Sequence, residues 1–477
     1  MGKLRRVALR CILGALLLVT SAPAWSYSLL THEQIIDLTW DDAIVPLLLS
    51  RFPNATQEEL EGARAYAYGG CVIQDIGYYP FGQVPFSDLT HYVRSGDFVM
   101  NLFRDAKDLD ELAFAVGALS HYIGDSIGHP MATNLAVPME FPKLRKKYGS
   151  SINYAEGEHE HVQVEFAFDI DEAAHQRVAP LRYLRRIGLQ VSMRQLTLAY
   201  YQTYGISADF SGSRGRRVNV RAYRFAVRTF IPRIAEALVL LHRRHETADV
   251  STQESMALRG EINAMASANN WAADQRRAGI GLWTLAGLIW ILPKVGPLKL
   301  AAIKGPTPQS EAAYQHSLVL SIAAMRKMLR RFTPPDKRKP PPARPGFKAK
   351  TEQPGSEMAK SRGAQAVTEV RMDPLRPLTN RDLDTGDPVK PGGYPLTDQT
   401  YAELLHTLTA QPNLSIPPGI KEDIEAYYSN LDAPFFTRKD PQRWAQVEKD
   451  LVTLKSMRTN PVPEIFPTYD TDTDGSN

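Results

Sequence analysis

The chain has 477 residues, of which 43% are hydrophobic and 23% are charged. This is the composition of an ordinary globular protein, so it excludes wholesale disorder, collagen-like repeats and a multi-span membrane protein. The net charge is +4, and the four basic residues Lys3, Arg5, Arg6 and Arg10 account for all of it. The rest of the chain is therefore neutral, and its charge does not indicate a double-stranded nucleic acid as partner.

The first 24 residues have the pattern of a signal peptide. A basic stretch, Lys3 to Arg10, is followed by an apolar core, Cys11 to Val19, and by Ala22-Pro23-Ala24, which has the A-x-A form of a cleavage site. The core is shorter than the roughly 20 residues of a membrane span, which disfavours the alternative of an uncleaved anchor helix. We therefore expect a secreted or periplasmic protein whose mature chain begins at Trp25.

Apolar residues at spacings of three and four predict helices along most of the chain. An alternating strand pattern is not found, so the sequence predicts an all-α protein. The expected helical segments are 31–49, 56–68, 108–127, parts of 176–250, 311–332, 401–405 and 421–457. Thr56 and Glu59 form a capping box at the start of the second segment. Loops are expected at Gly69-Gly70, at 77–85 and at 211–215.

The segments suggest a division of the chain. We expect a helical domain over 25–250, with its motifs in 25–175, and a helical extension over 251–332. A Pro-rich basic linker, mostly disordered, is expected over 333–400, a helical region over 401–457 and a polar tail over 458–477. The extension contains an apolar run at 280–292 that is too short for a span. It fits a buried helix, or a helix that enters a lipid interface through Trp283 and Trp290.

Residues 25–175 combine acidic character with histidine. Acidic residues exceed basic ones by 14 in this block, which also holds seven of the 11 histidines. Carboxylates and imidazoles are ligands for divalent metals, although acidic surface helices would give the same charge. Cys71 is the single cysteine left after cleavage, so no intrachain disulfide can form, and we expect it to be a buried small residue.

The segment from His121 to His129 carries the strongest motif. Its sequence, His-Tyr-Ile-Gly-Asp-Ser-Ile-Gly-His, places His121, Asp125 and His129 at successive steps of four on one face of a helix. Two imidazoles beside a carboxylate suit transition-metal coordination, and the carboxylate can bridge two ions. The alternative is an exposed polar face, which the apolar neighbours Ile123 and Ile127 disfavour.

Further candidates are weaker one by one. His161 and Glu165 form a second pair four residues apart, whereas His159 would point away from their face. Asp75 follows the Gly69-Gly70 pair, and His91 follows Asp75. His32 lies near the start of the first expected helix.

The order of these residues along the chain resembles the zinc-dependent phospholipase C family. The order is Trp25, His32, Asp75, His91, His121, Asp125, His129, His161 and Glu165. The same domain type occurs in glycosylphosphatidylinositol-specific phospholipase D, and single-strand zinc nucleases share its fold. The resemblance covers about 25–175 and implies an all-helical domain that holds up to three zinc ions.

The resemblance also implies a role for each residue. Asp75, His91, His121 and Asp125 would hold one zinc, and His129, His161 and Glu165 a second. The backbone nitrogen and oxygen of Trp25 would hold a third zinc with His32 and Asp125, so that Asp125 bridges two ions. Asp75 would be the general base for a metal-bound water, whose pKa the ions lower.

These implications lead to an exported zinc-dependent phosphodiesterase as the expected function. Its substrate would be a phospholipid or a related lipid phosphoester, with peripheral contact to a membrane. Ile76 replaces the aromatic residue that follows Asp75 in phosphatidylcholine-cleaving members, which argues against a preference for that lipid. The alternatives are a single-strand nuclease, whose family usually has Asp in place of Glu165, and a non-catalytic zinc domain that binds a membrane or cell wall.

Overall fold

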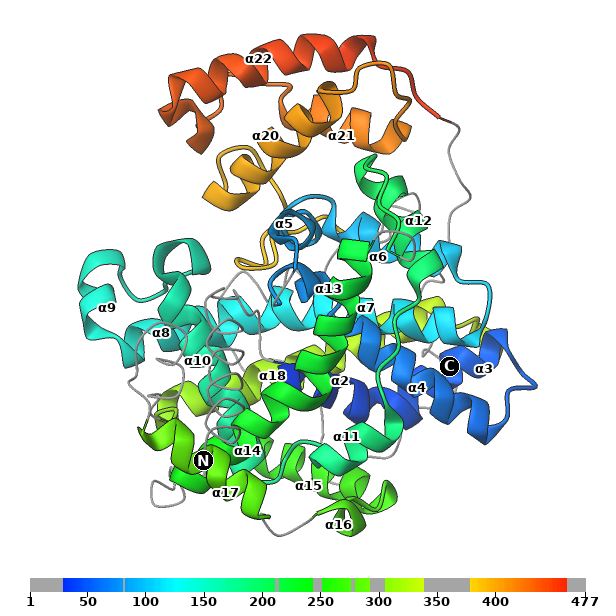
Figure 1. Cartoon of the computed structure of the whole chain (residues 1–477), viewed down its shortest axis with the longest axis vertical. Coiled ribbons are helices and arrows are strands. Elements are labelled where there is room, and N and C mark those ends of the chain that lie inside the picture. Colours follow the sequence, from blue (N-terminus) through cyan, green and yellow to red (C-terminus); the bar gives the residue numbers. More distant parts are fainter. Residues whose placement is uncertain are drawn as a thin grey trace, which may run out of the picture.

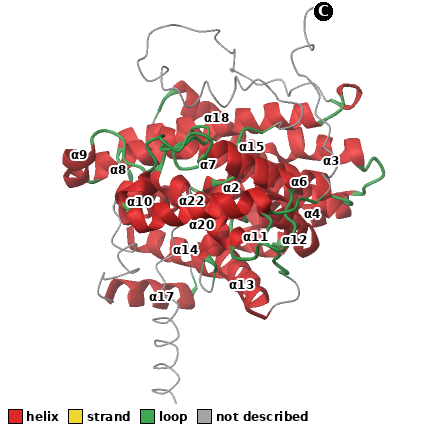
Figure 2. Cartoon of the chain, turned by 90° about the horizontal axis from the view of Figure 1, so that it is seen from above, coloured by secondary structure: helices red, strands yellow, loops and turns green. Residues whose placement is uncertain are grey.

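The computed structural model describes residues 29–79, 82–210, 214–242, 251–275, 279–291, 305–338 and 378–460. The predicted signal peptide, Trp25 and most of the predicted polar tail lie outside these residues. The described chain is built from helices, and its β-structure amounts to two isolated bridges, Arg381 with Pro388 and Ile416 with Thr459. Figure 2 shows this helical architecture from above. The prediction of an all-α fold is confirmed.

In the first half, the predicted segments 31–49, 56–68 and 108–127 are helical, and further helices between residues 84 and 174 lie where no segment is predicted. The helices of this half are α2 (Leu29–Thr39), α3 (Val45–Arg51), α4 (Gln57–Gly70), α5 (Val84–Tyr92), α6 (Ser95–Asp105), α7 (Leu109–Gly128), α8 (Asn134–Glu140), α9 (Pro142–Tyr148), α10 (Tyr154–Ala174), α11 (Leu181–Ile187) and α12 (Met193–Tyr204). Thr56 caps α4 in the predicted capping box with Glu59. A π-helical turn, Trp40–Ile44, joins α2 to α3, and a short 3-10 turn, Gln74–Gly77, precedes α5.

Helix α7 is the centre of the fold (Figure 1). It packs against α2, α4, α6 and α18, and its residues from Glu111 to Gly128 are buried. The prediction of a loop at Gly69-Gly70 is wrong, because both glycines belong to the last turn of α4. A Cβ at Gly70 would collide with the backbone of Phe114 in α7, and a Cβ at Gly117 would collide with the backbone of Ala67 in α4. The glycines therefore allow close approach of two helices rather than a turn.

The remaining helices surround this core. They are α13 (Arg214–Phe225), α14 (Ile231–His242), α15 (Gln253–Ala268), α16 (Trp271–Asp274), α17 (Ile280–Ile291), α18 (Pro308–Phe332), α20 (Pro395–Thr409), α21 (Pro418–Tyr427) and α22 (Pro441–Ser456). Helix α18 runs beside α2 and α7, while α20 and α22 pack on each other and α20 packs on α5. The C-terminal helices thus form one end of the molecule in Figure 1.

The structure differs from the predicted linker over 378–400. From Leu378 the chain forms turns that pack against the helical core, and α20 already begins at Pro395. Leu378, Leu383 and Tyr394 are buried, and so is the side chain of Arg381, whose backbone exchanges hydrogen bonds with Ser95. The prolines, glycines and charged residues of this segment predict a loop. Its apolar residues follow no helical or strand spacing, so the sequence does not indicate that the segment is buried. Residues 339–377 of the predicted linker lie outside the described residues.

Helix α17 covers the predicted apolar segment. It packs on α14 through a face that includes Ala286 and Ile289, which are buried. Other side chains of α17 are exposed, with 85% of Ile280 and 73% of Trp290 accessible to solvent. No helix among the described residues has the length and apolarity needed to cross a membrane.

Candidate metal centre

Eight of the nine predicted site residues converge in the interior of the fold. They come from α2 (His32), the turn before α5 (Asp75), α5 (His91), α7 (His121 and Asp125), the π-helical turn His129–Thr133 that follows α7 (His129), and α10 (His161 and Glu165). All eight are buried, and they form three groups. Within each group, the potential ligand atoms lie within 4.8 Å of one another. The ninth, Trp25, lies outside the described residues.

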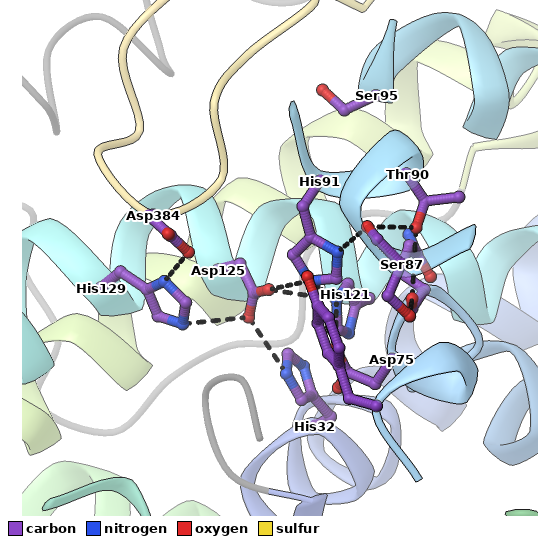
Figure 3. A network of polar contacts seen from close by, with 12 residues as sticks. His32, Asp75, Ser87, Thr90, His91, Ser95, His121, Asp125, His129 and Asp384 are labelled. Carbon is purple, nitrogen blue, oxygen red and sulfur yellow. Dashed lines mark hydrogen bonds and ion pairs between the residues drawn. The ribbon is translucent and has the colours of Figure 1, made fainter. Parts of the chain in front are cut away.

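The first group contains Asp75, His91 and His121 (Figure 3). The Nε2 atom of His91 lies 3.2 Å from Oδ1 of Asp75 and 3.3 Å from Nε2 of His121. Asp125 adds its Oδ2, which is 3.0 Å from Nε2 of His121 and 3.5 Å from Nε2 of His91. These are the four residues that the family resemblance assigns to one zinc.

The second group contains His129, His161 and Glu165. Oε1 of Glu165 lies 2.9 Å from Nε2 of His161 and 3.2 Å from Nε2 of His129. Among the described residues, Nδ1 of His161 and Oε2 of Glu165 have no hydrogen-bond partner, and Oε1 of Glu165 has only its contacts with the two imidazoles. Such buried polar atoms are costly unless something binds them, and a cation between them would do so.

The third group contains His32, His121 and Asp125, so Asp125 lies between all three groups. Its Oδ1 is 3.1 Å from Nε2 of His32 and 3.8 Å from Nε2 of His129, while Oδ2 faces the first group. The two oxygens thus point toward different sets of imidazoles. This is the arrangement that a carboxylate bridging two ions requires.

The hydrogen bonds of the first group show that it fits a metal ion. Nδ1 of His91 lies 2.7 Å from the carbonyl of Ser87, and Nδ1 of His121 lies 3.1 Å from the carbonyl of Cys71. A carbonyl can only accept, so each Nδ1 carries a proton and each neutral ring has its lone pair on Nε2. In the neutral rings the two lone pairs then face each other at 3.3 Å, which is favourable only when a proton or a metal ion lies between them.

The electrostatics of the metal-free groups follow from burial and close charges. Burial would raise the pKa of Asp125, but the imidazoles of His121 and His129 outweigh it and hold that pKa well below its usual value. Burial would lower the pKa of His91, but its contacts with Asp125 and Asp75 raise it to about 10. Protons therefore occupy nitrogen atoms that a metal would use, and metal binding would release them.

Several supporting residues are not predicted by the sequence. Gly124 leaves room for His32, because a Cβ there would lie 3.1 Å from the imidazole ring, which stacks on His121. Asp384, from the segment predicted as linker, lies 3.3 Å from Nδ1 of His129. Conversely, His159 lies outside the three groups, and Cys71 contributes its carbonyl rather than its thiol. The Cys71 side chain is buried, as expected.

Comparison with known proteins identifies the helical domain. Residues 31–210 match the family model described as zinc dependent phospholipase C, and this range contains all eight described site residues. No curated protein and no solved structure gives a significant match. The predicted resemblance is confirmed over residues 31–210: this part of the chain is a zinc-dependent phospholipase C domain, with zinc as its cofactor.

Proposed function

We propose that this zinc-dependent phospholipase C domain hydrolyses a phosphoester bond of phospholipids or related lipid phosphoesters. The observation that carries the proposal is the convergence of three potential ligand groups on Asp125 inside the domain that matches the family. Asp75, His91, His121 and Asp125 would hold one zinc, and His129, His161 and Glu165 a second. His32 and Asp125 would hold a third.

The division of labour within the site follows from its charges. When bound, zinc neutralises the phosphate and lowers the pKa of a bound water toward neutrality. Asp75 is the base that would accept a proton from that water. Burial would raise the pKa of Asp75, but His121 and His91 hold it below its usual value, so the carboxylate is ionised at neutral pH. Because this carboxylate is a weak base, it can accept a proton only from a water whose pKa a bound metal has already lowered.

The proposal includes export and a ligand role for the mature N-terminus. It is supported by Ala22-Pro23-Ala24, which would expose the amine of Trp25 after cleavage. A free amine has a lone pair for a metal, whereas an amide nitrogen has none. His32 lies only seven positions after Trp25, within reach of the same ion.

Peripheral contact with a lipid surface is part of the same proposal. Its support is the exposed side of α17, where Ile280, Trp283, Leu288 and Trp290 are accessible to solvent. In the sequence, Arg276 and Arg277 precede this helix and Lys294 follows it. Tryptophan and basic residues beside an apolar helix are typical of segments that enter a lipid interface.

A substrate panel tests the proposal. The secreted protein should release phosphorylated head group or phosphate-containing lipid from phospholipid vesicles, lose this activity to a chelator, and regain it with zinc. In parallel, the protein is tested for cleavage of single-stranded DNA and for binding to membranes without hydrolysis. Zinc-dependent cleavage of DNA without cleavage of lipid would favour the nuclease, and zinc-loaded protein inactive on both would favour a non-catalytic domain.

The membrane contact has its own test. A Trp283→Ala, Trp290→Ala double variant should bind vesicles more weakly while keeping its zinc and its activity on a soluble phosphodiester. Val452→Ala, which removes another exposed apolar side chain from α22, is the control and should bind vesicles normally. Unchanged vesicle binding by the double variant would assign the exposed face of α17 to another role.

A further inference from the structure

The turn that precedes α20 brings a carboxylate from the far end of the chain to the metal centre. Oδ1 of Asp384 lies 3.3 Å from Nδ1 of His129, and only 3% of the Asp384 residue is exposed (Figure 3). This residue lies 174 positions beyond the end of the matched domain. Its approach to His129 is therefore a property of the C-terminal region and not of the domain alone.

The side chain of Asp384 is held in one orientation. Its Oδ2 accepts hydrogen bonds from the hydroxyl of Tyr92 at 3.0 Å and from the hydroxyl of Tyr394 at 2.6 Å. Because these donors occupy Oδ2, Oδ1 is directed to His129. The amide of Asn134, just after the π-helical turn that begins at His129, donates to the Asp384 carbonyl at 2.8 Å.

The backbone around Asp384 is fixed as well. The N–H of Leu383 donates to the carbonyl of His91, a predicted ligand, at 3.1 Å. The N–H groups of Asp384 and Thr385 donate to Oδ1 of Asp382, which closes the turn. Gly386 lies in the left-handed region, and a Cβ there would collide with the carbonyl of Ser126 in α7. The turn is thus placed against both α5 and α7.

This geometry determines which nitrogen of His129 is available. The negative charge of Asp384, 3.3 Å from Nδ1, favours the tautomer that carries its proton on Nδ1, so the lone pair of the neutral ring lies on Nε2, which faces Glu165 at 3.2 Å. Metal-binding histidines commonly donate their second N–H to a carboxylate or carbonyl, which orients the ring and strengthens the ligand. Backbone carbonyls face Nδ1 of His91 and Nδ1 of His121, whereas the charged carboxylate of Asp384 faces Nδ1 of His129.

We propose that Asp384 is a positioning residue for His129, so that the C-terminal region completes the second zinc group. The inference rests on zinc binding by His129, His161 and Glu165, and it does not depend on the identity of the substrate. Loss of the Asp384 carboxylate should weaken one zinc ion selectively, by about 10- to 100-fold in affinity, as is typical when such an outer partner is removed.

Zinc release tests this inference without reference to activity. The full-length, zinc-loaded protein is mixed with a chromogenic chelator, and the amplitude and rate of each release phase are recorded. Asp384→Ala should accelerate one phase by about 10-fold or more and leave the other ions unchanged. Asp382→Asn is the matched control, because it removes a buried charge from the same turn while its amide oxygen can still accept the N–H groups of Asp384 and Thr385, and its release should be normal.

Two further measurements separate positioning from stability. Cobalt(II) in place of zinc should give an altered visible absorption spectrum in Asp384→Ala and an unaltered one in Asp382→Asn. Should Asp384→Ala fail to fold, Asp384→Asn decides, because its amide oxygen keeps the shape and loses the charge. Normal release and a normal cobalt spectrum in a folded Asp384 variant, or equal changes in the Asp382 control, would overturn the inference. A wild-type protein that binds zinc but cleaves no lipid would refute the proposed function alone.

Discussion

Replacing Asp125 by Asn should remove more than one zinc ion. Its carboxylate lies 3.0 Å from His121, 3.1 Å from His32 and 3.5 Å from His91, so one negative charge serves several imidazoles. A unit positive charge about 4 Å away interacts with it by about 4 kcal/mol at an effective dielectric constant of about 20. That energy corresponds to about 1,000-fold in affinity, and a divalent ion would lose more.

The assay combines zinc content by mass spectrometry with hydrolysis of phospholipid vesicles. Asp125→Asn should stay soluble, lose more than one zinc per chain and lose hydrolysis by about 1,000-fold or more. Asp37→Asn is the matched control, because Asp37 is a buried carboxylate on α2 that pairs with Arg64 and Tyr68. It should lower stability and keep the zinc. Full zinc and full activity in Asp125→Asn would refute the bridging role.

Four other predictions follow from the site and its surroundings. Cys71→Ala should leave the zinc content unchanged, because only the Cys71 carbonyl faces His121; loss of one zinc would assign a role to the thiol. A protein that retains residues ahead of Trp25 should bind one zinc fewer and hydrolyse poorly until a protease exposes Trp25; equal activity of both forms would exclude the terminal amine. Gly124→Ala should displace the imidazole of His32, 3.1 Å from the new Cβ, by a few tenths of an ångström and weaken the third zinc, as measured by equilibrium dialysis. Burial raises the pKa of Asp88 from 3.8 to about 6, so the folded protein loses stability as the pH rises through this range and the carboxylate becomes charged. Asp88→Asn should therefore stabilise the protein at pH 8, by at most about 3 kcal/mol, and should have no such effect below pH 4. A Tm difference between the two proteins that is the same at every pH would contradict the prediction.

The sequence predicts much of this fold because its main signals are local. Thr56 and Glu59 mark the start of α4, and the spacing of apolar residues marks α7. The four-residue steps from His121 to His129 place three candidate ligands on one side of α7 and its continuation. Order along the chain then adds His32, Asp75 and His91, whose proximity in space no local pattern reveals.

The features that the sequence does not predict depend on contacts between distant segments. Gly69 and Gly70 suggest a turn, but they serve the close packing of α4 on other parts of the fold. Asp384 stands in a polar segment whose composition is typical of a linker, and nothing near it indicates His129 as a partner. Such contacts arise from tertiary packing between distant segments, and no local spacing or motif in a single sequence indicates them.

Anomalous X-ray diffraction above and below the zinc absorption edge tests the central claim most directly. Crystals of the processed protein should show zinc among Asp75, His91, His121 and Asp125, and again among His129, His161 and Glu165. A third zinc should lie beside His32 and Asp125. Zinc at other residues, or its absence from the first two groups, would contradict the assignment of this site as a hydrolytic zinc centre.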